Sequence, residues 1–538
     1  MNTGGRTRAA ALAAALALAA GACSGGGPSD DGPGRSPTPG RTGDIGGADA
    51  RTGPPELPAE FTDQRPAWET CAAPTPVQGT GPAPGPDWEC ATLTVPLDYA
   101  HPDDGETIGI ALIRTRSAPR TNRVGSLVFN FGGPGGSGVA TLPRVADRYT
   151  RLRDGFDLVS FDPRGVGESE GVVCRTGPEL DAAAQEDDGP PAGPAEEREL
   201  LADSRAYAED CEERAGRLLP HLTTENTARD LDLLRAGLGD DQLHYFGVSY
   251  GTKLGAVYAH HFPQHVGRTV LDAVVDPTRD LVQRALLQTE GFQLALDGYL
   301  ADCVTEADCP TGPATGDPAH AALTALLDDL RERPLPTATG RDLTQGLAVT
   351  ALLALLYSED SWPFLTQGLT QALDDGRGDL LLAAAEQYNG RDDEGRYRNL
   401  QAANNAVTCA DFASRPTLET VHDNEAAFAA ASPVFGPHLV WSLLSCASWP
   451  VTGERDRPEV SVDGARVILL LATTGDPATP YAGAGRMREA MGGPGAAALL
   501  TYEGEGHGAY SSGDACVTAA VDAHLLSGAT PADGTVCT

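Results

Sequence analysis

The stretch Leu243-His-Tyr-Phe-Gly-Val-Ser-Tyr-Gly-Thr-Lys-Leu254 decides the fold of this chain. A strand is predicted over residues 243–246, and a helix over residues 250–262 follows it after a tight turn. Within the turn, Gly247-Val-Ser-Tyr-Gly251 matches G-x-S-x-G, the elbow that holds a nucleophilic serine above the end of a sheet strand. Glycine flanks the serine because a side chain there would clash with the strand or the helix. We therefore predict that Ser249 is a nucleophile.

A second match, Gly167-Glu-Ser-Glu-Gly171, shows that the motif alone is weak evidence. Ser169 lies in a predicted loop between two glutamates, and no helix begins at it. Two flanking negative charges would also oppose an oxyanion intermediate. The context therefore favours Ser249 as the elbow serine.

Strands and helices alternate on both sides of the elbow. The predicted strands cover residues 91–98, 107–114, 126–130, 156–161, 243–246, 269–272, 467–471 and 497–502. A helix is also predicted over residues 224–238. This alternation is typical of a mostly parallel sheet with covered faces. Residues 280 to about 440 are mostly helical in pattern and rich in Leu and Ala, so we expect a helical insertion that caps an α/β core.

A glycine-rich loop, Phe131-Gly-Gly-Pro-Gly-Gly-Ser-Gly138, directly follows a predicted strand. Acyl transfer needs backbone N–H groups aimed at the developing oxyanion. One donor comes from the residue after the nucleophile, here Tyr250, and the other from such a loop, for which we choose Gly133. A phosphate-binding loop is disfavoured because it would need a lysine that is absent here.

A nucleophilic serine also needs a base and an acid that orients the base, in the chain order serine, acid, histidine. His507 lies in Gly504-Glu-Gly-His-Gly508, after the last apolar strand, and Asp476 lies in Gly475-Asp-Pro-Ala-Thr-Pro480, after the strand before it. The other histidines lie near the elbow helix or precede the strands that they would have to follow. A turn aspartate and a glycine-loop histidine are the structural alternatives. We predict that Asp476 and His507 complete the catalytic set.

The N-terminus is typical of an exported protein. Arg6 and Arg8 precede a short apolar stretch, Ala9 to Ala20, and Ala20-Gly21-Ala22 fits a cleavage site, so residues 1–22 are predicted as a signal peptide. The apolar stretch is too short to span a bilayer.

The next residue is Cys23, and the run Leu18 to Cys23 resembles a bacterial lipobox, with Ala20 where that motif usually has leucine. Cys23 is therefore a candidate lipidation site, with free secretion as the alternative. Residues 23–65 are rich in Gly, Pro and Ser and are predicted to be a disordered tether. We expect the protein to be exported, extracellular or at the cell surface, and lipid-anchored through Cys23 if the lipobox is used.

Cysteine usage agrees with export. The chain has 11 cysteines, and ten remain without Cys23. An even number in an exported protein suggests five disulfides, although sequence alone does not fix their connectivity. Nearest-neighbour pairing gives 71–90, 174–211, 303–309, 409–446 and 516–537.

Charge excludes some partners. The chain has 39 Lys+Arg and 75 Asp+Glu, a net charge of −36. Nucleic-acid binding needs a basic face, and anionic lipid also attracts basic segments. We therefore expect neither nucleic acid nor electrostatic docking on a membrane.

Taken together, Leu127-Val-Phe-Asn-Phe-Gly-Gly-Pro-Gly-Gly-Ser-Gly138, Phe161-Asp-Pro-Arg-Gly-Val-Gly-Glu-Ser169 and the elbow, Asp476 and His507 segments resemble the actinobacterial secreted tripeptidyl aminopeptidases. These are α/β-hydrolases related to proline iminopeptidases. Phe131 stands where proline iminopeptidases have histidine before the glycines, which favours the tripeptidyl branch. The Cys71/Cys90 and Cys516/Cys537 pairs also resemble that group.

The resemblance covers about residues 66–538. It implies an α/β-hydrolase fold with a first core half over 66–280, a helical cap over 281–440, and a second core half over 441–538. It also implies an exported serine exopeptidase that cleaves short peptides, tripeptides by expectation, from free N-termini of peptides or proteins. The Ser-His-Asp mechanism requires no metal and no cofactor.

An aminopeptidase must recognise an ammonium group, which calls for carboxylates near the nucleophile. Tyr357-Ser-Glu-Asp-Ser-Trp362 in the predicted cap is a candidate segment, with Glu359 or Asp360 as the contributing residue. The alternative is a solvated acidic turn.

Two rival functions remain open on the sequence. One is a carboxylesterase or lipase of the same fold. The other is a non-catalytic surface binding protein that keeps the scaffold, which an intact Ser249, Asp476 and His507 argue against.

Overall fold

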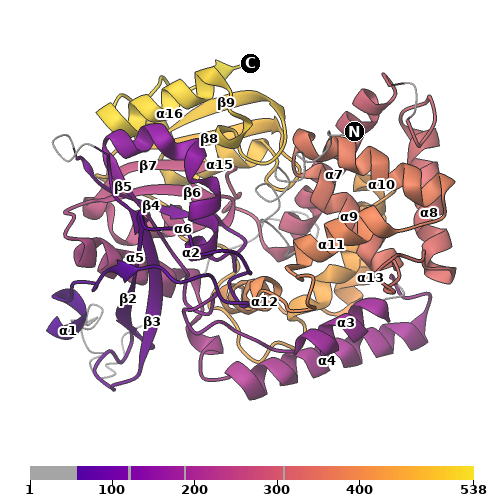
Figure 1. Cartoon of the computed structure of the whole chain (residues 1–538), viewed down its shortest axis with the longest axis horizontal. Coiled ribbons are helices and arrows are strands. Elements are labelled where there is room, and N and C mark those ends of the chain that lie inside the picture. The colour runs from indigo at the N-terminus through magenta and orange to yellow at the C-terminus, as the bar shows by residue number, and fades with distance from the viewer. Residues whose placement is uncertain (1–56, 119–122, 187–188, 307–308) are drawn as a thin grey trace, which may run out of the picture.

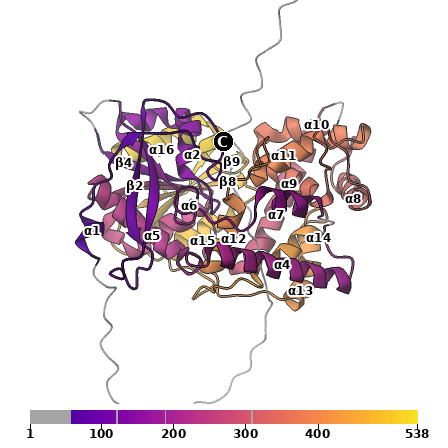
Figure 2. The same cartoon turned by 60° about the horizontal axis from the view of Figure 1, so that its bottom comes forward.

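A computed structural model describes residues 57–118, 123–186, 189–306 and 309–538. The predicted signal peptide, Cys23 and most of the predicted tether lie outside the described residues. The described structure divides into a sheet-based core and a helical cap, which lie side by side in both views (Figures 1 and 2).

The core is a ten-stranded sheet in the order β1-β2-β3-β5-β4-β6-β7-β8-β9-β10. The strands are β1 (Glu69–Thr70), β2 (Trp88–Pro96), β3 (Thr107–Thr115), β4 (Gly125–Asn130), β5 (Phe156–Phe161), β6 (Leu243–Val248), β7 (Val266–Asp272), β8 (Ile468–Gly475), β9 (Ala497–Glu505) and β10 (Thr535–Cys537). The edge strands β1, β2 and β3 pair antiparallel, and every pair from β5 to β10 is parallel. The predicted mostly parallel sheet is confirmed.

Helices cover both faces of the sheet, because each inner strand buries side chains on both sides. Val128 packs into one layer, and its neighbours Leu127 and Phe129 pack into the other. The first layer contains α5 (Thr224–Leu238), α6 (Tyr250–His261) and α15 (Ala482–Met491). The second contains α2 (Gly138–Val145), the 3₁₀ helix η3 (Ala146–Asp154) and α16 (Ala515–Ser527). Such two-sided burial is typical of parallel sheets.

The cap is inserted between β7 and β8. Its elements are α7 (Leu281–Cys303), α8 (Asp317–Glu332), α9 (Gln345–Leu356), η6 (Glu359–Ser361), α10 (Trp362–Asp374), α11 (Asp379–Asn389), α13 (Leu418–Ala431), α14 (Gly436–Leu439) and η7 (Val440–Cys446). The helix α9 is apolar all round and packs at the centre of the cap's own hydrophobic cluster. A helix with that composition has to be surrounded by others.

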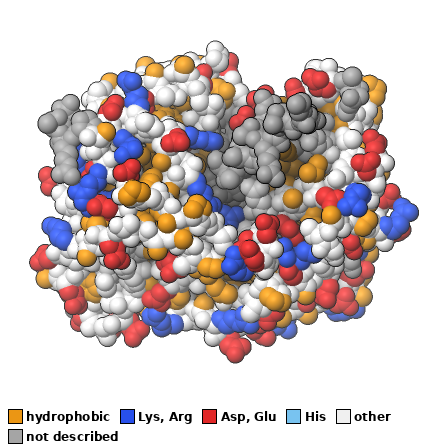
Figure 3. All heavy atoms as spheres, in the orientation of Figure 1, with side chains coloured by type: hydrophobic (Ala, Val, Ile, Leu, Met, Phe, Trp, Pro, Cys, Tyr) orange, Lys and Arg blue, Asp and Glu red, His pale blue; other side chains and the backbone are white. Residues whose placement is uncertain are grey.

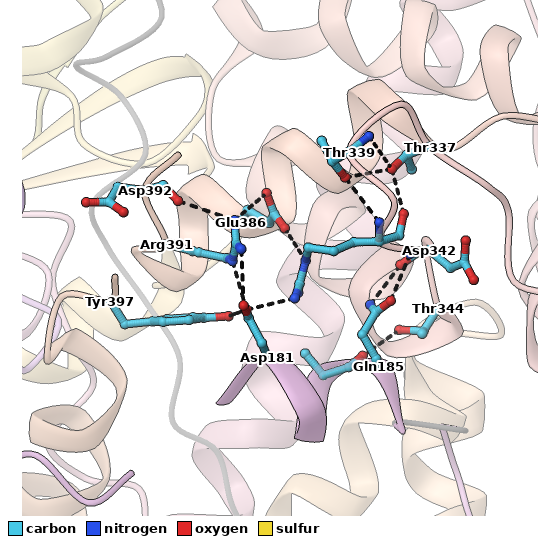
Figure 4. A network of polar contacts seen from close by, with 12 residues as sticks. Asp181, Gln185, Thr337, Thr339, Asp342, Thr344, Glu386, Arg391, Asp392 and Tyr397 are labelled. Atoms are coloured by element: carbon cyan, nitrogen blue, oxygen red, sulfur yellow. Dashed lines mark hydrogen bonds and ion pairs between the residues drawn. The ribbon is translucent and has the colours of Figure 1, made fainter. Parts of the chain in front are cut away.

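Two segments depart from the expected division of the chain. The helix α3 (Gly177–Gln185) and the N-terminal half of α4 (Pro194–Ala215) precede β6 in sequence, yet they lie along the cap (Figure 1). The C-terminal half of α4 packs into the core cluster through Ala208, Cys211 and Ala215. Asp181 of α3 contacts Arg341 and Arg391 of the cap, as Figure 4 shows in part. The residues 66–280 are therefore not all core.

The other exception is α12 (Leu400–Asp411), which falls within the expected cap range but packs against the core, with Ala406 and Val407 in the core cluster. The described structure also includes residues before 66. The helix α1 (Ala59–Thr62) lies inside the range predicted as tether, and its Phe61 is buried.

The five disulfides are those of nearest-neighbour pairing. They are Cys71–Cys90, Cys174–Cys211, Cys303–Cys309, Cys409–Cys446 and Cys516–Cys537. In the part of the chain that the structure describes, no helix is long and apolar enough to cross a bilayer.

Candidate active site

Ser249 sits between β6 and α6 in a backbone conformation that L-residues rarely adopt, with φ of 57° and ψ of −122°. The turn is tight: a Cβ on Gly247 would lie 2.3 Å from the carbonyl oxygen of Gly251, and one on Gly251 would lie 2.5 Å from that of Asn130. Strained backbone of this kind clusters at functional sites. The structure therefore has the strand-turn-helix geometry that an elbow serine needs.

Ser169, the serine of the second motif, is completely buried. Its hydroxyl donates a hydrogen bond to the carbonyl oxygen of Asp162 at 2.6 Å and accepts one from the N–H of Ala111 at 2.8 Å. This serine fixes a loop to the sheet and has no surface on which a substrate could bind.

His507 and Asp476 form a buried pair at the ends of neighbouring strands. The Nδ1 atom of His507 lies 2.9 and 3.0 Å from the two carboxylate oxygens of Asp476. Asp476 also accepts hydrogen bonds from the N–H groups of Ala478 and Thr479 and from the Thr479 hydroxyl. This geometry holds the tautomer in which the other ring nitrogen, Nε2, can accept a proton.

The Nε2 atom of His507 is buried and has no hydrogen-bond partner within the described structure. An unpaired buried nitrogen is costly in a folded protein. Within the described structure no hydrogen bond joins Nε2 to the Ser249 hydroxyl. Such catalytic hydrogen bonds are often long in the absence of substrate and shorten in the complex.

Asp272, at the end of β7, connects the serine turn to the histidine loop. Its carbonyl oxygen accepts the N–H of Ser249 at 2.9 Å. Its carboxylate accepts the N–H groups of Ala509 and Tyr510 at 2.8 and 2.9 Å. Burial raises the pKa of Asp272 to about 6, against the lowering effect of these two N–H groups. One residue thus holds both halves of the site.

The glycine-rich loop follows β4 and leaves an N–H group available. Gly133 has φ of +115°, and a Cβ there would lie 2.8 Å from the nitrogen of Gly135, so only glycine fits. Within the described structure the Gly133 N–H has no hydrogen-bond partner. The Tyr250 N–H begins α6 and has no acceptor inside the helix.

The helix α12 contacts both of these donor segments. The side-chain amide of Asn404 donates to the carbonyl oxygen of Pro134 at 3.1 Å. At the other end of α12, Asp411 accepts from the N–H of Thr224 at 2.7 Å, and the hydroxyl of Thr224 contacts that of Tyr250 at 2.9 Å. Asp411 also pairs with Lys253 at 2.6 Å.

The cap reaches the histidine loop directly. The N–H of His507 donates to the carbonyl oxygen of Tyr357 at 2.8 Å, and the two rings meet edge to face at 5.3 Å. The sequence hypothesis that the 357–362 segment lies near the site therefore agrees with its position.

Glu359 and Asp360 are exposed and line a cavity of about 190 Å³ together with His507. Glu505, at the end of β9, lines the same cavity, and its Oε2 atom is buried without a hydrogen-bond partner in the described part of the chain. Burial and the negative charge of Glu359 raise the pKa of Glu505. The cavity beside His507 is therefore a place where a cation would be stabilised.

Known proteins resemble this chain in sequence. Residues 432–537 match the family described as TAP-like protein. Serine protease Hip1 of Mycobacterium tuberculosis is 38% identical over 467 residues, which cover 83% of this chain and 87% of the relative. The chain belongs to the TAP-like family of α/β-hydrolases.

Other TAP-like relatives differ in the activity that their names state. Carboxylesterase B of Mycobacterium tuberculosis is 34% identical, over 83% of this chain and 86% of the relative. Tripeptidyl aminopeptidase of Streptomyces lividans is 33% identical, over 87% of this chain and 86% of the relative. The expected resemblance, the α/β-hydrolase fold and the serine hydrolase class are thus confirmed for this TAP-like chain.

Sequence reasoning missed Asp272, Glu505 and the contacts of α12. Asp272 ends a predicted strand at the carboxyl edge of the sheet, which is where such folds place function, so its position was a usable signal. Glu505 lies two residues before His507 in the same loop region. Nothing local marks Asn404 or Asp411, because their partners are distant in sequence.

Proposed function

We propose that this protein is an exported serine exopeptidase that removes short peptides, tripeptides by preference, from free N-termini. The observation that carries the proposal is the cavity in which His507 and three carboxylates, Glu359, Asp360 and Glu505, lie together. A serine hydrolase needs the histidine, and recognition of an α-ammonium group needs the carboxylates.

In the proposed reaction, the hydroxyl of Ser249 attacks the carbonyl carbon of the scissile peptide bond, and His507 takes the proton at Nε2. Asp476 holds the imidazole and stabilises its positive form. The N–H groups of Gly133 and Tyr250 stabilise the oxyanion. His507 then protonates the leaving amine, and water, deprotonated by the same imidazole, releases the acyl peptide from Ser249.

The ammonium end of the substrate is assigned to the carboxylate wall. We expect only a short acyl segment to fit between that wall and Ser249, because the carbonyl oxygen of Tyr357, next to the wall in sequence, accepts the N–H of His507. Glu359→Gln and Asp360→Asn should therefore raise the KM for free-amine peptides and leave peptides with blocked N-termini unaffected. An unchanged KM in both variants would rule out these two residues as the amine site.

Export is supported by the five disulfides, since disulfides persist in oxidising compartments. It is also supported by the predicted signal peptide over residues 1–22. We also propose that Cys23 carries a lipid. Mass spectrometry of the protein purified from the membrane fraction would test this, because a lipidated Cys23 adds the mass of the lipid to the mature chain.

The decisive experiment is a substrate panel. Tripeptide p-nitroanilides with free and with acetylated N-termini are compared with p-nitrophenyl esters of short acids, with Ser249→Ala as the control. We expect the free-amine anilides to be preferred and Ser249→Ala to be inactive on all substrates. If the protein hydrolyses the esters and none of the anilides, the proposal that it is a peptidase is wrong.

A carboxylesterase is the second candidate, favoured by the 34% identical relative named carboxylesterase B. The same panel decides between the two. Failure of a fluorophosphonate probe to label Ser249 would instead leave a binding protein without catalysis.

A further inference from the structure

The cavity beside His507 has walls of opposite charge. Glu359 and Asp360 come from the cap and Glu505 from β9, whereas Arg148 comes from η3 of the core. In the described part of the chain, Arg148 makes no hydrogen bond or ion pair, and no carboxylate lies within 4.0 Å of it. Arg151, three residues along the same helix, is paired with Asp522 at 3.2 Å.

A second cavity, of about 420 Å³, adjoins the first, because Thr141 and Val145 line both. Arg144 and Arg398 line this second cavity. Arg144 lies in the last turn of α2 and Arg148 in the 3₁₀ helix η3 that follows it, so the two arginines reach the adjoining cavities from one continuous segment. Basic side chains are visible along the hollow between the core and the cap (Figure 3).

Arg144 and Arg398 donate only to carbonyl oxygens, at 2.9 Å to Thr80 and at 2.8 Å to Gln387. The carboxylates that line the same cavity and form ion pairs do so with other arginines: Glu386 with Arg341 and Arg391, and Asp392 with Arg396. Burial and the nearby charge of Arg144 lower the pKa of Arg398 to about 10, so Arg398 remains cationic at neutral pH.

These three arginines line two adjoining cavities, and within the described structure none of them has a carboxylate partner. Guanidinium groups bind carboxylates through paired hydrogen bonds. An anion placed among them would relieve the repulsion between Arg144 and Arg398.

We propose that Arg148, Arg144 and Arg398 form a subsite for a carboxylate on the leaving-group side of the scissile bond. This proposal rests on the peptidase function: if the ammonium end lies at the acidic wall, the other end of a short peptide runs toward the arginines. The protein would then act on oligopeptides with a nearby free C-terminus in preference to the N-termini of long chains.

The test compares three tetrapeptides that share one free-amine tripeptide and differ in the leaving residue. The leaving residue is alanine with a free carboxylate, alanine amide, or glutamate amide. We expect kcat/KM for the free carboxylate to exceed that for alanine amide by on the order of tenfold, as a charge-assisted hydrogen bond provides. Glutamate amide shows whether an acidic side chain can occupy the same subsite.

We define the carboxylate-to-amide ratio as kcat/KM for the free-carboxylate peptide divided by kcat/KM for the alanine amide peptide. Arg148→Gln and Arg398→Gln should bring this ratio toward one, mainly by raising the KM of the free-carboxylate peptide. Arg151→Gln is the matched control, since its side chain pairs with Asp522, and it should keep the wild-type ratio. The ratio should also shrink in 0.5 M salt, because these arginines are partly or fully exposed. A wild-type ratio of one, or an unchanged ratio in both variants, would overturn the subsite.

Failure of the proposed function gives a different result. If the wild type cleaves none of the tetrapeptides, inhibition of ester hydrolysis by dialanine and by dialanine amide is compared instead. Stronger inhibition by the free acid that disappears in Arg148→Gln would keep the subsite while the peptidase is rejected. Equal inhibition by both would reject the subsite as well.

Discussion

At the scale of single residues, the pairing of Asp476 with His507 makes the sharpest prediction. Asp476→Asn keeps the shape of the side chain but presents an amide to Nδ1, which favours the wrong tautomer of the imidazole. We expect kcat to fall by about 10³- to 10⁴-fold with little change in KM. Steady-state kinetics on the best substrate of the panel measures this, and a loss below tenfold would mean that Asp476 does not orient the base.

The raised pKa of Asp272 predicts that the free energy of unfolding depends on pH. Its pKa of about 6 in the folded protein lies above the ordinary value of 3.8. The stabilisation from this group is therefore complete below about pH 4 and is lost as the pH rises through 6. Relative to the wild type, Asp272→Asn should gain up to roughly 3 kcal/mol in free energy of unfolding between pH 4 and pH 7.5.

Urea unfolding at several pH values measures that gain. The Asn variant carries a constant penalty for losing an acceptor of the Ala509 and Tyr510 N–H groups, so only the slope with pH is diagnostic. Asp147→Asn, an exposed aspartate on η3, serves as the control. If the free energy of unfolding changes with pH in the same way in Asp272→Asn and in the wild type, Asp272 does not have a raised pKa in the folded protein.

Residues on local motifs could be predicted from the sequence, and residues placed by distant contacts could not. Ser249, Asp476 and His507 follow strands and stand among glycines, so the backbone pattern marks them. The partners of Asp272 lie 237 and 238 residues away, and those of Asp411 up to 187. No local pattern encodes such pairs.

At the scale of elements, α6 and α12 are joined by a buried ion pair. Lys253, the only lysine of the chain, is buried against Asp411 on α12. Burial lowers the pKa of Lys253 and outweighs the opposite effect of the Asp411 charge. Such a pair is costly to break on one side only.

Asp411→Ala should therefore lower the free energy of unfolding by roughly 3–5 kcal/mol, because it leaves a buried ammonium group unpaired. The same change made in a Lys253→Met background should cost clearly less. A double-mutant cycle from urea unfolding gives the coupling. Additive effects would show that the two helices are not joined through this pair.

The elements themselves were predictable to different degrees. Alternating strands and helices marked the sheet, because parallel strands are apolar on both faces. The helix α3 contacts the cap although it lies in the range expected for the core, and α4 contacts both parts, because Ala208, Cys211 and Ala215 pack into the core cluster while Leu200 and Leu201 pack against the cap. A helix pattern does not reveal which partner the helix covers. The short strand β10 escaped prediction because its three residues pair only with β9.

At the scale of the whole molecule, the attachment of α3 to the cap depends on charge. Asp181 accepts hydrogen bonds from Arg391 and Tyr397 and pairs with Arg341 (Figure 4). Asp181→Asn removes the charge that faces both guanidinium groups. We expect faster hydrogen exchange in α3 and α11, with the core sheet unaffected.

Asp203→Asn, at an exposed position on α4, is the control for that experiment. Hydrogen exchange followed by mass spectrometry resolves the two helices separately. Equal protection of α3 in Asp181→Asn and wild type would show that apolar packing alone holds it.

The disulfides have a consequence for how the molecule is made. Each bridge closes a loop of 6 to 37 residues, and no bridge encloses or interleaves with another. For a chain that emerges N-terminus first into an oxidising compartment, the correct partner of every unpaired cysteine from Cys71 onward is the next one to appear. When Cys23 is lipidated, oxidation in order of emergence therefore yields the native set, and maturation needs an oxidant but no reshuffling of wrong bridges.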